Sequence, residues 1–470
     1  MSLLVKTMRF VRSIFMKLWL PVVLLCTSFV SVAQDTEAES TLRARSTEFE
    51  KQIVTVAPGV FTALGYSPAN SSMVVGHDGV IIIDTGMTPN HSIEILEAFQ
   101  AISDLPVRGI IYTHGHGDHT GGASVFVGEE PPEIWAMENF GIEDGPLLAA
   151  GLTIQRQRGI RQAGFALPDE LRINNGIAPA MRPGNANAFS ANENASANTS
   201  PTHTFAGGRE RIDIAGVELD LVAAPGETDD QIYVWLPEQR VLFAGDNFYR
   251  SFPNLYAIRG TPYRDVYLWA NSLDLMIAED AVAVVPGHTR PVIGEAESRA
   301  ALTRYRDAIR FVHDKTVEGM NIGLTPDELV DYVKLPEELA THPDLGEYYG
   351  RVAWAVRSIF NGYLGWYDGN PTNLLPLSPG EEAQRMVELA GGADALLLAA
   401  QTALSEGDVQ WAAQLADYLI AFDPMLSAAK LVKADALTVM ARNSENALGR
   451  NFNLTIANML REQAATENSE

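Results

Sequence analysis

The densest group of potential metal ligands in this chain is His-Gly-His-Gly-Asp-His at residues 114–119. It comes directly after Val107–Tyr112, an apolar run that is typical of a buried strand. His114 and His116 are two residues apart, so an extended exit from that strand points both imidazoles to one side. Asp118 and His119 follow on a glycine-containing turn and can face a second position. Imidazole and carboxylate ligands without thiolate suit zinc, and also manganese or iron. The motif therefore predicts a metal centre rather than a surface histidine cluster.

The elements that position this motif are short β-type runs separated by turns, one helical stretch at His91–Ser103 and, after about Ser298, helices almost alone. Strand, strand, helix and strand with ligands at strand ends predict an α/β sandwich. The expected strands besides Val107–Tyr112 are Ile53–Val56, Gly59–Phe61, Ser72–Gly76, Val80–Asp84, Ile212–Val222, Ile232–Leu236 and Arg240–Ala244.

Three further candidate ligands follow expected strands. Glu227, after Pro225-Gly226, can join His114 and His116. His288 can join Asp118 and His119, and Asp246 is a carboxylate able to bridge two cations. Each is weak alone, because such residues more often serve in turns, caps or packing. In this order, each after a strand, the seven ligands resemble the set of the metallo-β-lactamase superfamily, which implies two Zn²⁺ per subunit.

The resemblance narrows at Glu227, because most of that superfamily has His there and a carboxylate is similar to the alkylsulfatase branch. The similarity extends from about Glu48 to Arg461. It implies a metallo-β-lactamase αββα sandwich, followed by an all-α dimerization domain, and hence a homodimer. The runs that carry it are Gly65–Ser71 (GYSPANS), Asn254–Gly260 (NLYAIRG), Tyr263–Asp265 (YRD), Gly362–Pro371 (GYLGWYDGNP) and Val387–Gly392 (VELAGG).

The implied activity is zinc-dependent hydrolysis of a sulfuric ester by a metal-bridging hydroxide, with Asp118 in a catalytic role besides its ligand role. Three carboxylates and a hydroxide bring a pair of divalent cations close to neutrality. A small anionic ester, which the resemblance implies to be an organic sulfate, then needs a side-chain cation. Arg259 is the first candidate and Arg264 the second. On resemblance alone, Asn254, Asn70 and Tyr66 are further substrate-binding candidates.

Two departures from that branch limit the substrate. The bridging position holds Asp246, where alkylsulfatases of this type carry the longer Glu. The chain also stops at Glu470, without the sterol-carrier-like domain that offers an apolar groove, so long-chain alkyl sulfates are in doubt. Other dinuclear hydrolases on this scaffold (β-lactamase, lactonase or phosphoesterase) and a non-catalytic dimeric binding protein stay as alternatives. C–O cleavage and S–O cleavage both stay open, and no residue is assigned as the general acid.

Residues 1–33 have the plan of a secretory signal peptide: four basic residues, an apolar run from Leu18 to Val30, and an expected cleavage after Ala33. A start at Met16 would also give a signal. We expect a secreted or periplasmic protein without stable membrane insertion after cleavage. The one cysteine, Cys26, lies in that segment. Cleavage moves the net charge from −25 to −29, which argues against nucleic acid or anionic membranes as partners.

The expected domain plan places a polar lead-in at residues 34–47, a catalytic domain at 48–298 and a helical dimerization domain at 299–465. A segment rich in Asn, Ala, Ser, Pro and Gly at 167–201 is expected to be a loop or lid. Paired helices are expected from Ala393 to Thr438, with breaks at Gly407-Asp408 and Asp423-Pro424. The aromatic residues of the helical half are expected first to pack in its core, with a substrate wall or an interface as alternatives: Trp354, Phe360, Tyr363, Trp366 and Tyr367.

Overall fold

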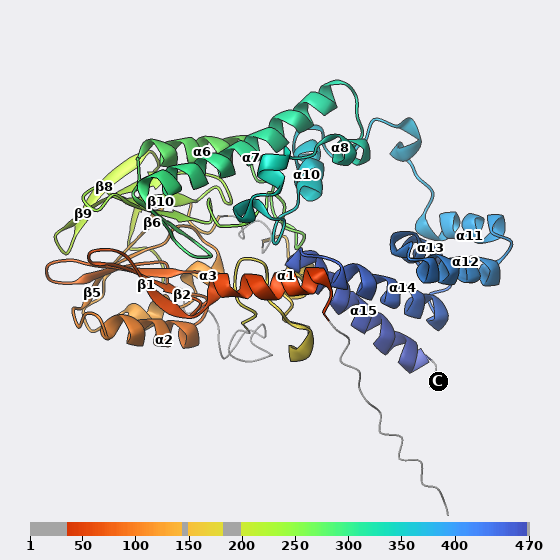
Figure 1. Ribbon diagram of the computed structural model, residues 1–470, viewed down its shortest axis with the longest axis horizontal. Helices are drawn as coiled ribbons and strands as arrows, with labels where there is room; N and C mark the ends of the chain where they lie inside the picture. Colours follow the sequence, from red (N-terminus) through yellow and green to blue (C-terminus); the bar gives the residue numbers. More distant parts are fainter. Residues whose placement is uncertain (1–34, 143–148, 182–198, 468–470) are drawn as a thin grey trace, which may run out of the picture. The chain divides into compact units, whose positions relative to one another are not determined.

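The computed structural model describes residues 35–142, 149–181 and 199–467. The predicted signal peptide and the central part of the predicted lid, residues 182–198, lie outside the described residues. The chain begins here with a helix and then enters two β-sheets, which precede a long succession of helices (Figure 1).

The first sheet has seven strands whose spatial order is their order in the chain. The strands from β1 to β4 pair antiparallel, and those from β4 to β7 pair parallel. Every residue of β4 is buried, as expected for a central strand rich in isoleucine and covered on both faces. The strands are β1 (Gln52–Ala57), β2 (Val60–Leu64), β3 (Ser71–Val75), β4 (Val80–Ile83), β5 (Val107–Ile111), β6 (Glu133–Met137) and β7 (His203–Phe205).

The second sheet has the order β13-β12-β11-β10-β9-β8, with one parallel pair between β11 and β12. The expected single strand over 212–222 is wrong, because the chain forms an antiparallel hairpin there. Ala215 and Gly216 both have positive φ, 54° and 73°, as a tight two-residue hairpin turn requires. The strands are β8 (Arg209–Ile214), β9 (Val217–Ala223), β10 (Ile232–Leu236), β11 (Val241–Gly245), β12 (Ala283–Pro286) and β13 (Val292–Ile293).

The two sheets pack face to face and are covered by helices on their outer faces, which confirms the predicted αββα sandwich (Figure 1). The inner core joins residues such as Ile83 and Ile111 to Leu221 and Val234. Helix α2 (Pro89–Gln100) covers the outer face of the first sheet through Ile95 and Phe99. Helices α6 (Val266–Ala278) and α7 (Glu295–Asn321) cover the second sheet. A sandwich of this kind leaves the loops at one end of both sheets free to meet.

The predicted polar lead-in at 34–47 contains the helix α1 (Glu37–Arg45), which the sequence analysis did not name. Thr36 and Glu39 form a capping box at its start. Leu42 is fully buried. Glu39 forms ion pairs with Arg442 and Arg450, which are more than 400 positions further along the chain. The local sequence is polar because this helix is held largely by ion pairs to distant residues rather than by an apolar stripe.

The helical half begins with α7. Its helices end at the predicted breaks: Gly407-Asp408 separates α12 (Ala393–Glu406) from α13 (Val409–Phe422), and Asp423-Pro424 lies between α13 and α14 (Ser427–Arg442). The remaining helices are α3 (Gly117–Thr120), α5 (Ile154–Gln162), α8 (Pro326–Tyr332), α9 (Glu337–Ala340), α10 (Val352–Leu364), α11 (Pro379–Leu389) and α15 (Ala447–Glu467). Short 3-10 helices lie at Ser46–Phe49, Ala123–Phe126, Asp169–Leu171, Pro343–Leu345 and Pro371–Leu374.

The prediction of a packed aromatic core in this half is wrong for Tyr363 and Trp366. Phe360 is buried, but Tyr363 is 48% exposed and Trp366 is 71% exposed. Leu375, in the connection to α11, is 93% exposed. The aromatic residues near the end of α10 therefore extend beyond the core of one chain.

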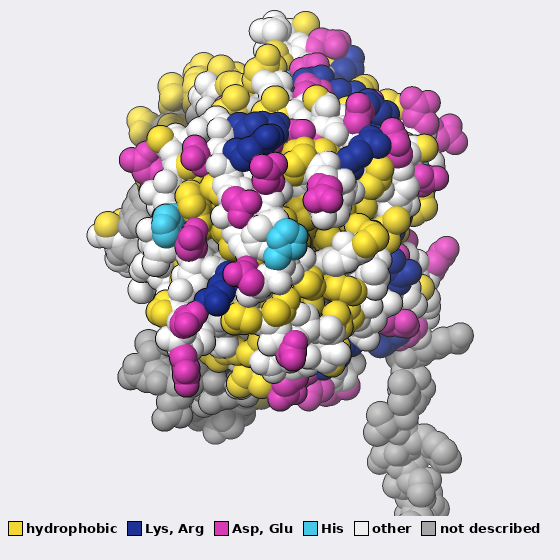
Figure 2. Space-filling view, turned by 90° about the vertical axis from the view of Figure 1, so that its left-hand side faces the viewer, with side chains coloured by type: hydrophobic (Ala, Val, Ile, Leu, Met, Phe, Trp, Pro, Cys, Tyr) yellow, Lys and Arg dark blue, Asp and Glu magenta, His cyan; other side chains and the backbone are white. Residues whose placement is uncertain are grey.

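Within the described residues, no single helix combines the length and apolar character needed to cross a membrane, and only the bent pair of α11 and α12 meets those two criteria when taken together. On the face shown in Figure 2, acidic, basic and apolar side chains are interspersed.

Candidate metal centre

The predicted ligands come from loops at the same end of the sandwich. The loop after β5 carries His114 and leads into α3, and the loops after β9, β11 and β12 carry Glu227, Asp246 and His288. A backbone hydrogen bond from Ile232 N to Thr113 O (2.8 Å) ties the two sheets together beside the motif. Strand ends thus bring residues that are up to 174 positions apart into one place.

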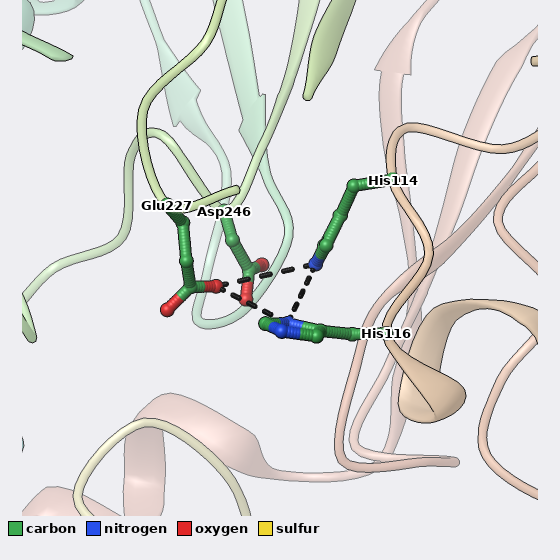
Figure 3. Close-up of side chains that lie close together, drawn as sticks. All are labelled: His114, His116, Glu227 and Asp246. Atoms are coloured by element: carbon green, nitrogen blue, oxygen red, sulfur yellow. Dashed lines mark hydrogen bonds and ion pairs between the residues drawn. The ribbon is translucent and has the colours of Figure 1, made fainter. Parts of the chain in front are cut away.

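One group of potential ligands consists of His114, His116, Glu227 and Asp246 (Figure 3). Their nearest ligand atoms lie within 4.8 Å of one another. Glu227 Oε2 is 4.0 Å from His114 Nε2 and 3.6 Å from His116 Nδ1. The two imidazole nitrogens are 2.9 Å apart. All four side chains in Figure 3 point toward one common point, as a single cation would require.

The second group consists of Asp118, His119 and His288. His288 Nε2 is 3.4 Å from Asp118 Oδ2. Asp246 lies between the two groups, since its Oδ1 is 3.2 Å from His119 Nε2 and its Oδ2 is 3.2 Å from His288 Nε2. The structure therefore brings all seven predicted ligands together, with Asp246 where a bridging carboxylate would sit.

Three atoms at the centre of this cluster fit a metal rather than a closed hydrogen-bond network. His119 Nε2, Glu227 Oε2 and Asp246 Oδ1 are buried and make no hydrogen bond of good geometry among the described residues, although the first and the third form an ion pair at 3.2 Å. A buried polar atom without a partner costs about 1–3 kcal/mol, more if it is charged. Three such atoms facing one another indicate that these residues are arranged for cations.

The opposite nitrogens of three imidazoles are held by the protein. His119 Nδ1 is 2.7 Å from Asp84 Oδ2, and His288 Nδ1 donates to Pro68 O (2.8 Å). His114 Nδ1 lies 3.0 Å from Thr113 Oγ1. Such contacts fix ring orientation and leave Nε2 for the metal.

Asp84 was missed by the sequence analysis, which treated it as the end of a strand. Its carboxylate accepts from Thr113 N and Thr113 Oγ1, both at 2.8 Å, besides contacting His119. Its backbone has φ 56°, an unusual conformation for a residue with a side chain. The signal that could have found it is a carboxylate directly after the all-apolar Val80–Ile83 at the ligand end of the sheet.

Glu227 is oriented through both its side chain and its backbone. Arg264 Nη1 donates to Glu227 Oε1 at 2.5 Å, which leaves Oε2 to face the histidines. Both side chains of this ion pair are 3% exposed. The backbone N–H of Glu227 donates to Asn247 Oδ1 (3.1 Å), and a Cβ at Gly226 would overlap that oxygen. The glycine before Glu227 is therefore required for the approach of Asn247.

Three side chains of the cluster have strongly shifted pKa values. Burial lowers the pKa of His114 well below its usual value, so its ring is neutral. Burial alone would lower the pKa of His119, but Asp246 and Asp84 raise it well above the ordinary range. Burial alone would raise the pKa of Asp246, but His288 and His119 hold it well below the ordinary range. A cation at this place therefore competes with protons on the imidazoles.

A cavity of about 260 Å³ opens beside the cluster, and nearly every residue that lines it is polar. Arg259 is on its wall, with Nη2 3.3 Å from His116 Nε2 and with Nη1 buried and without a hydrogen-bond partner among the described residues. Gln155 and Tyr349 also line it and were missed by the sequence analysis. Burial and the nearby Glu227 carboxylate raise the pKa of Tyr349, so its hydroxyl stays protonated and able to donate.

Three of the predicted substrate-binding residues contact other parts of the protein in the structure. Asn70 uses its amide N–H groups on Pro286 O (2.9 Å) and Thr289 O (2.8 Å), so it holds the His288 loop instead. Tyr66 does not line the cavity and lies under Lys51, whose Nζ is 4.5 Å from the ring centroid. Arg264 lines the cavity, but it is engaged with Glu227.

Asn254, another predicted substrate contact, has a buried side chain without a hydrogen-bond partner among the described residues. Its backbone N–H donates to the hydroxyl of Tyr249 at 2.7 Å, and its carbonyl accepts from Arg264 at 2.6 Å. Its side-chain amide is buried, and neither Nδ2 nor Oδ1 has a hydrogen-bond partner among the described residues. It does not line the cavity, so its substrate contact stays a prediction.

Comparison with known proteins agrees with this geometry. The metallo-beta-lactamase superfamily model matches residues 64–288, and the alkyl sulfatase dimerisation model matches residues 325–463. A linear primary-alkylsulfatase of Pseudomonas sp. is 40% identical over 399 residues, which cover 82% of this chain and 72% of that protein. An (R)-specific secondary-alkylsulfatase of Pseudomonas sp. is 32% identical, and an alkyl/aryl-sulfatase of Saccharomyces cerevisiae is 30% identical. These two alignments cover 88% and 87% of this chain, and 63% of each relative.

Solved structures give the same result for the fold of the whole chain. A double mutant of a sec-alkyl sulfatase superposes with a TM-score of 0.84 at 30% identity, covering 92% of this chain and 69% of that one. A stereoselective inverting sec-alkylsulfatase from Pseudomonas sp. superposes with a TM-score of 0.78 at 31% identity, covering 88% and 66%. The chain therefore belongs to the alkylsulfatase family of the metallo-beta-lactamase superfamily.

Proposed function

We propose that this member of the family, a sulfuric ester hydrolase, cleaves small organic sulfate monoesters at a centre of two zinc ions. The observation that carries the proposal is that seven potential ligands converge beside the guanidinium of Arg259. Nη1 of Arg259 is buried and has no hydrogen-bond partner among the described residues. The ligands suit a metal pair, and the guanidinium suits an anion beside it.

The donor set supports zinc and a count of two. His114, His116 and Glu227 would hold one ion, and Asp118, His119 and His288 the other, with Asp246 shared between them. Nitrogen and carboxylate ligands without sulfur are typical of hydrolytic zinc sites. Ions bound there supply an activated water and positive charge for the ester oxygens.

Arg259 is the residue that we assign to the sulfate group. Its contact to His116 requires His116 Nε2 to act as an acceptor. A metal ligand bond at His116 Nδ1 leaves the ring proton on Nε2, which can then no longer accept. The guanidinium of Arg259 is thereby available to an anion in the cavity. Arg264 is committed to Glu227, so it acts by orienting a ligand instead.

The cavity indicates which part of the substrate is enclosed. At about 260 Å³, with polar walls, it suits the anionic group better than an apolar tail, so the organic group extends out of it. Tyr349, a neutral hydroxyl on the wall, can donate a hydrogen bond to an ester oxygen.

The decisive experiment compares zinc-loaded protein on a short alkyl sulfate, the matching alkyl phosphate and a β-lactam, with the wild type and Arg259→Ala side by side. We expect the sulfate to be the best substrate. Loss of a charge-assisted contact should cost Arg259→Ala about 1.5–3 kcal/mol, which is roughly a tenfold to 150-fold lower kcat/KM. Faster turnover of the lactam or the phosphate than of the sulfate by the wild type would contradict the assignment.

We also propose that the helical half forms a homodimer and that the protein is exported. The match to the alkyl sulfatase dimerisation family supports the first, as do exposed apolar side chains around the end of α10 and in α11, such as Trp366 (71%), Leu375 (93%) and Leu389 (82%). Apolar groups exposed in that number mark association surfaces. The signal-like composition of residues 1–33 supports the second.

A further inference from the structure

Helix α5 makes three hydrogen bonds to the segment that carries Arg259. Gln155 Nε2 donates to Gly260 O (3.2 Å), and Arg158 Nη2 donates to Ile258 O (2.6 Å). Gln162 Oε1 accepts from the backbone N–H of Arg259 (3.0 Å). Three side chains of one helix thus reach three consecutive residues of one loop.

The spacing of these three residues is that of one helical face. They are three and four positions apart, so all three side chains lie on the same side of α5. Gly159 lies on that side as well, and a Cβ there would be 3.8 Å from Arg259 Cδ. The helix therefore presents polar groups to the loop backbone and leaves room for the arginine side chain to lie along it.

The other support of α5 comes from the helical half. Asn451 of α15 is 2% exposed and donates from Nδ2 to the backbone carbonyl of Gln162 (3.3 Å). The guanidinium of Arg161 lies 6.0 Å from the ring centroid of Phe452, also in α15. A Cβ at Gly164, just after α5, would come within 2.9 Å of the Asn451 side chain. These contacts link α15 through Gln162 to Arg259.

We propose that Gln155, Arg158 and Gln162 are positioning residues that clamp the Ile258–Gly260 backbone and so fix the guanidinium of Arg259 over the metal cavity. The proposal rests on the assignment of Arg259 to the sulfate group. A long arginine side chain binds an anion in a defined geometry only if its own backbone is held. The clamp supplies that restraint, and its support by α15 makes anion recognition depend on the helical half.

The test uses Gln162→Leu, which removes the acceptor of the Arg259 N–H, and Gln162→Glu, which keeps an acceptor oxygen at the same reach. Gln157→Leu is the matched control, because Gln157 is exposed on the opposite side of the same helix. Arg158→Met is a second clamp variant, which stays informative if Gln162→Leu does not fold. Each variant is made in the wild type and in Arg259→Ala, and kcat/KM is measured for a short alkyl sulfate, with metal content as a second readout.

We expect Gln162→Leu and Arg158→Met to lower kcat/KM about fivefold to tenfold, the effect of losing one neutral or charge-assisted hydrogen bond. Gln162→Glu should keep most of the activity, Gln157→Leu all of it, and metal content should not change. In the Arg259→Ala background the clamp variants should cause no further loss, because they act through Arg259. An undiminished kcat/KM in both clamp variants, or an equal loss with and without Arg259, overturns the proposal. Full activity of Arg259→Ala itself instead refutes the assignment of Arg259 to the sulfate.

Discussion

The buried ion pair between Arg264 and Glu227 makes a measurable prediction about stability in the absence of metal. Arg264 Nη1 lies 2.5 Å from Glu227 Oε1 and 2.6 Å from the carbonyl of Asn254, and both charged side chains are 3% exposed. The other oxygen of Glu227 is buried and has no hydrogen-bond partner among the described residues. In the metal-free protein, Arg264 is therefore the main compensation for the Glu227 charge.

Arg264→Met keeps an unbranched apolar stem but removes the guanidinium, which leaves that carboxylate uncompensated. Removal of one member of a buried pair costs about 3–5 kcal/mol. At about 2–4 °C per kcal/mol for a domain of this size, the thermal midpoint of the metal-free catalytic domain should fall by roughly 6–20 °C. With zinc bound, a cation faces Glu227 Oε2, so the fall should be smaller. Differential scanning calorimetry with and without zinc measures both.

Two further variants make this reasoning refutable. Arg357→Met breaks an exposed pair with Asp327 and should cost at most about 1 kcal/mol. The double variant Arg264→Met with Glu227→Gln should recover stability in the metal-free protein, because the charge that needed compensation is gone. If Arg264→Met were no more harmful than Arg357→Met, or if Glu227→Gln restored nothing, the pair would not have the role that we assign to it.

Three further predictions concern metal, ligand orientation and assembly. Zinc titration of metal-free protein should saturate near two equivalents per chain, and elemental analysis of His116→Ala should find less metal; a wild type that retains none after reconstitution would contradict the centre. Asp84→Asn should weaken zinc binding about 10–100-fold in a chelator competition, because an amide N–H₂ would face the donors of Thr113 and His119; wild-type affinity would show that Asp84 is dispensable. Light scattering should give twice the mass of one chain, and Trp366→Ser with Leu375→Ser should shift it toward one, whereas a monomeric wild type would refute the dimer.

Most of the strands and helix ends could be predicted from the pattern of adjacent residues. β-branched runs such as Val80–Ile83 and Val107–Ile111 are strands in the structure because period and composition are properties of a few adjacent residues. Breaks such as Gly407-Asp408 end helices for the same reason: the glycine there takes a left-handed conformation, φ 87°. The hairpin at Ala215-Gly216 was missed because apolar and acidic residues alternate on both sides of it, so periodicity alone gave no boundary.

All seven ligands could be named from the sequence, because the dense motif at 114–119 and the order of Glu227, Asp246 and His288 after strands together resemble the ligand set of the superfamily. Tertiary structure alone decided how the polar residues around them are used. Asn70 contacts Pro286, 216 positions away, and so holds a ligand loop. Arg264 and Arg259 are five positions apart in the chain and both line the cavity, yet Arg264 neutralises Glu227 while Arg259 contacts His116. No local pattern separates two arginines in one loop, because the difference lies in which distant charge each one meets when the sheets close.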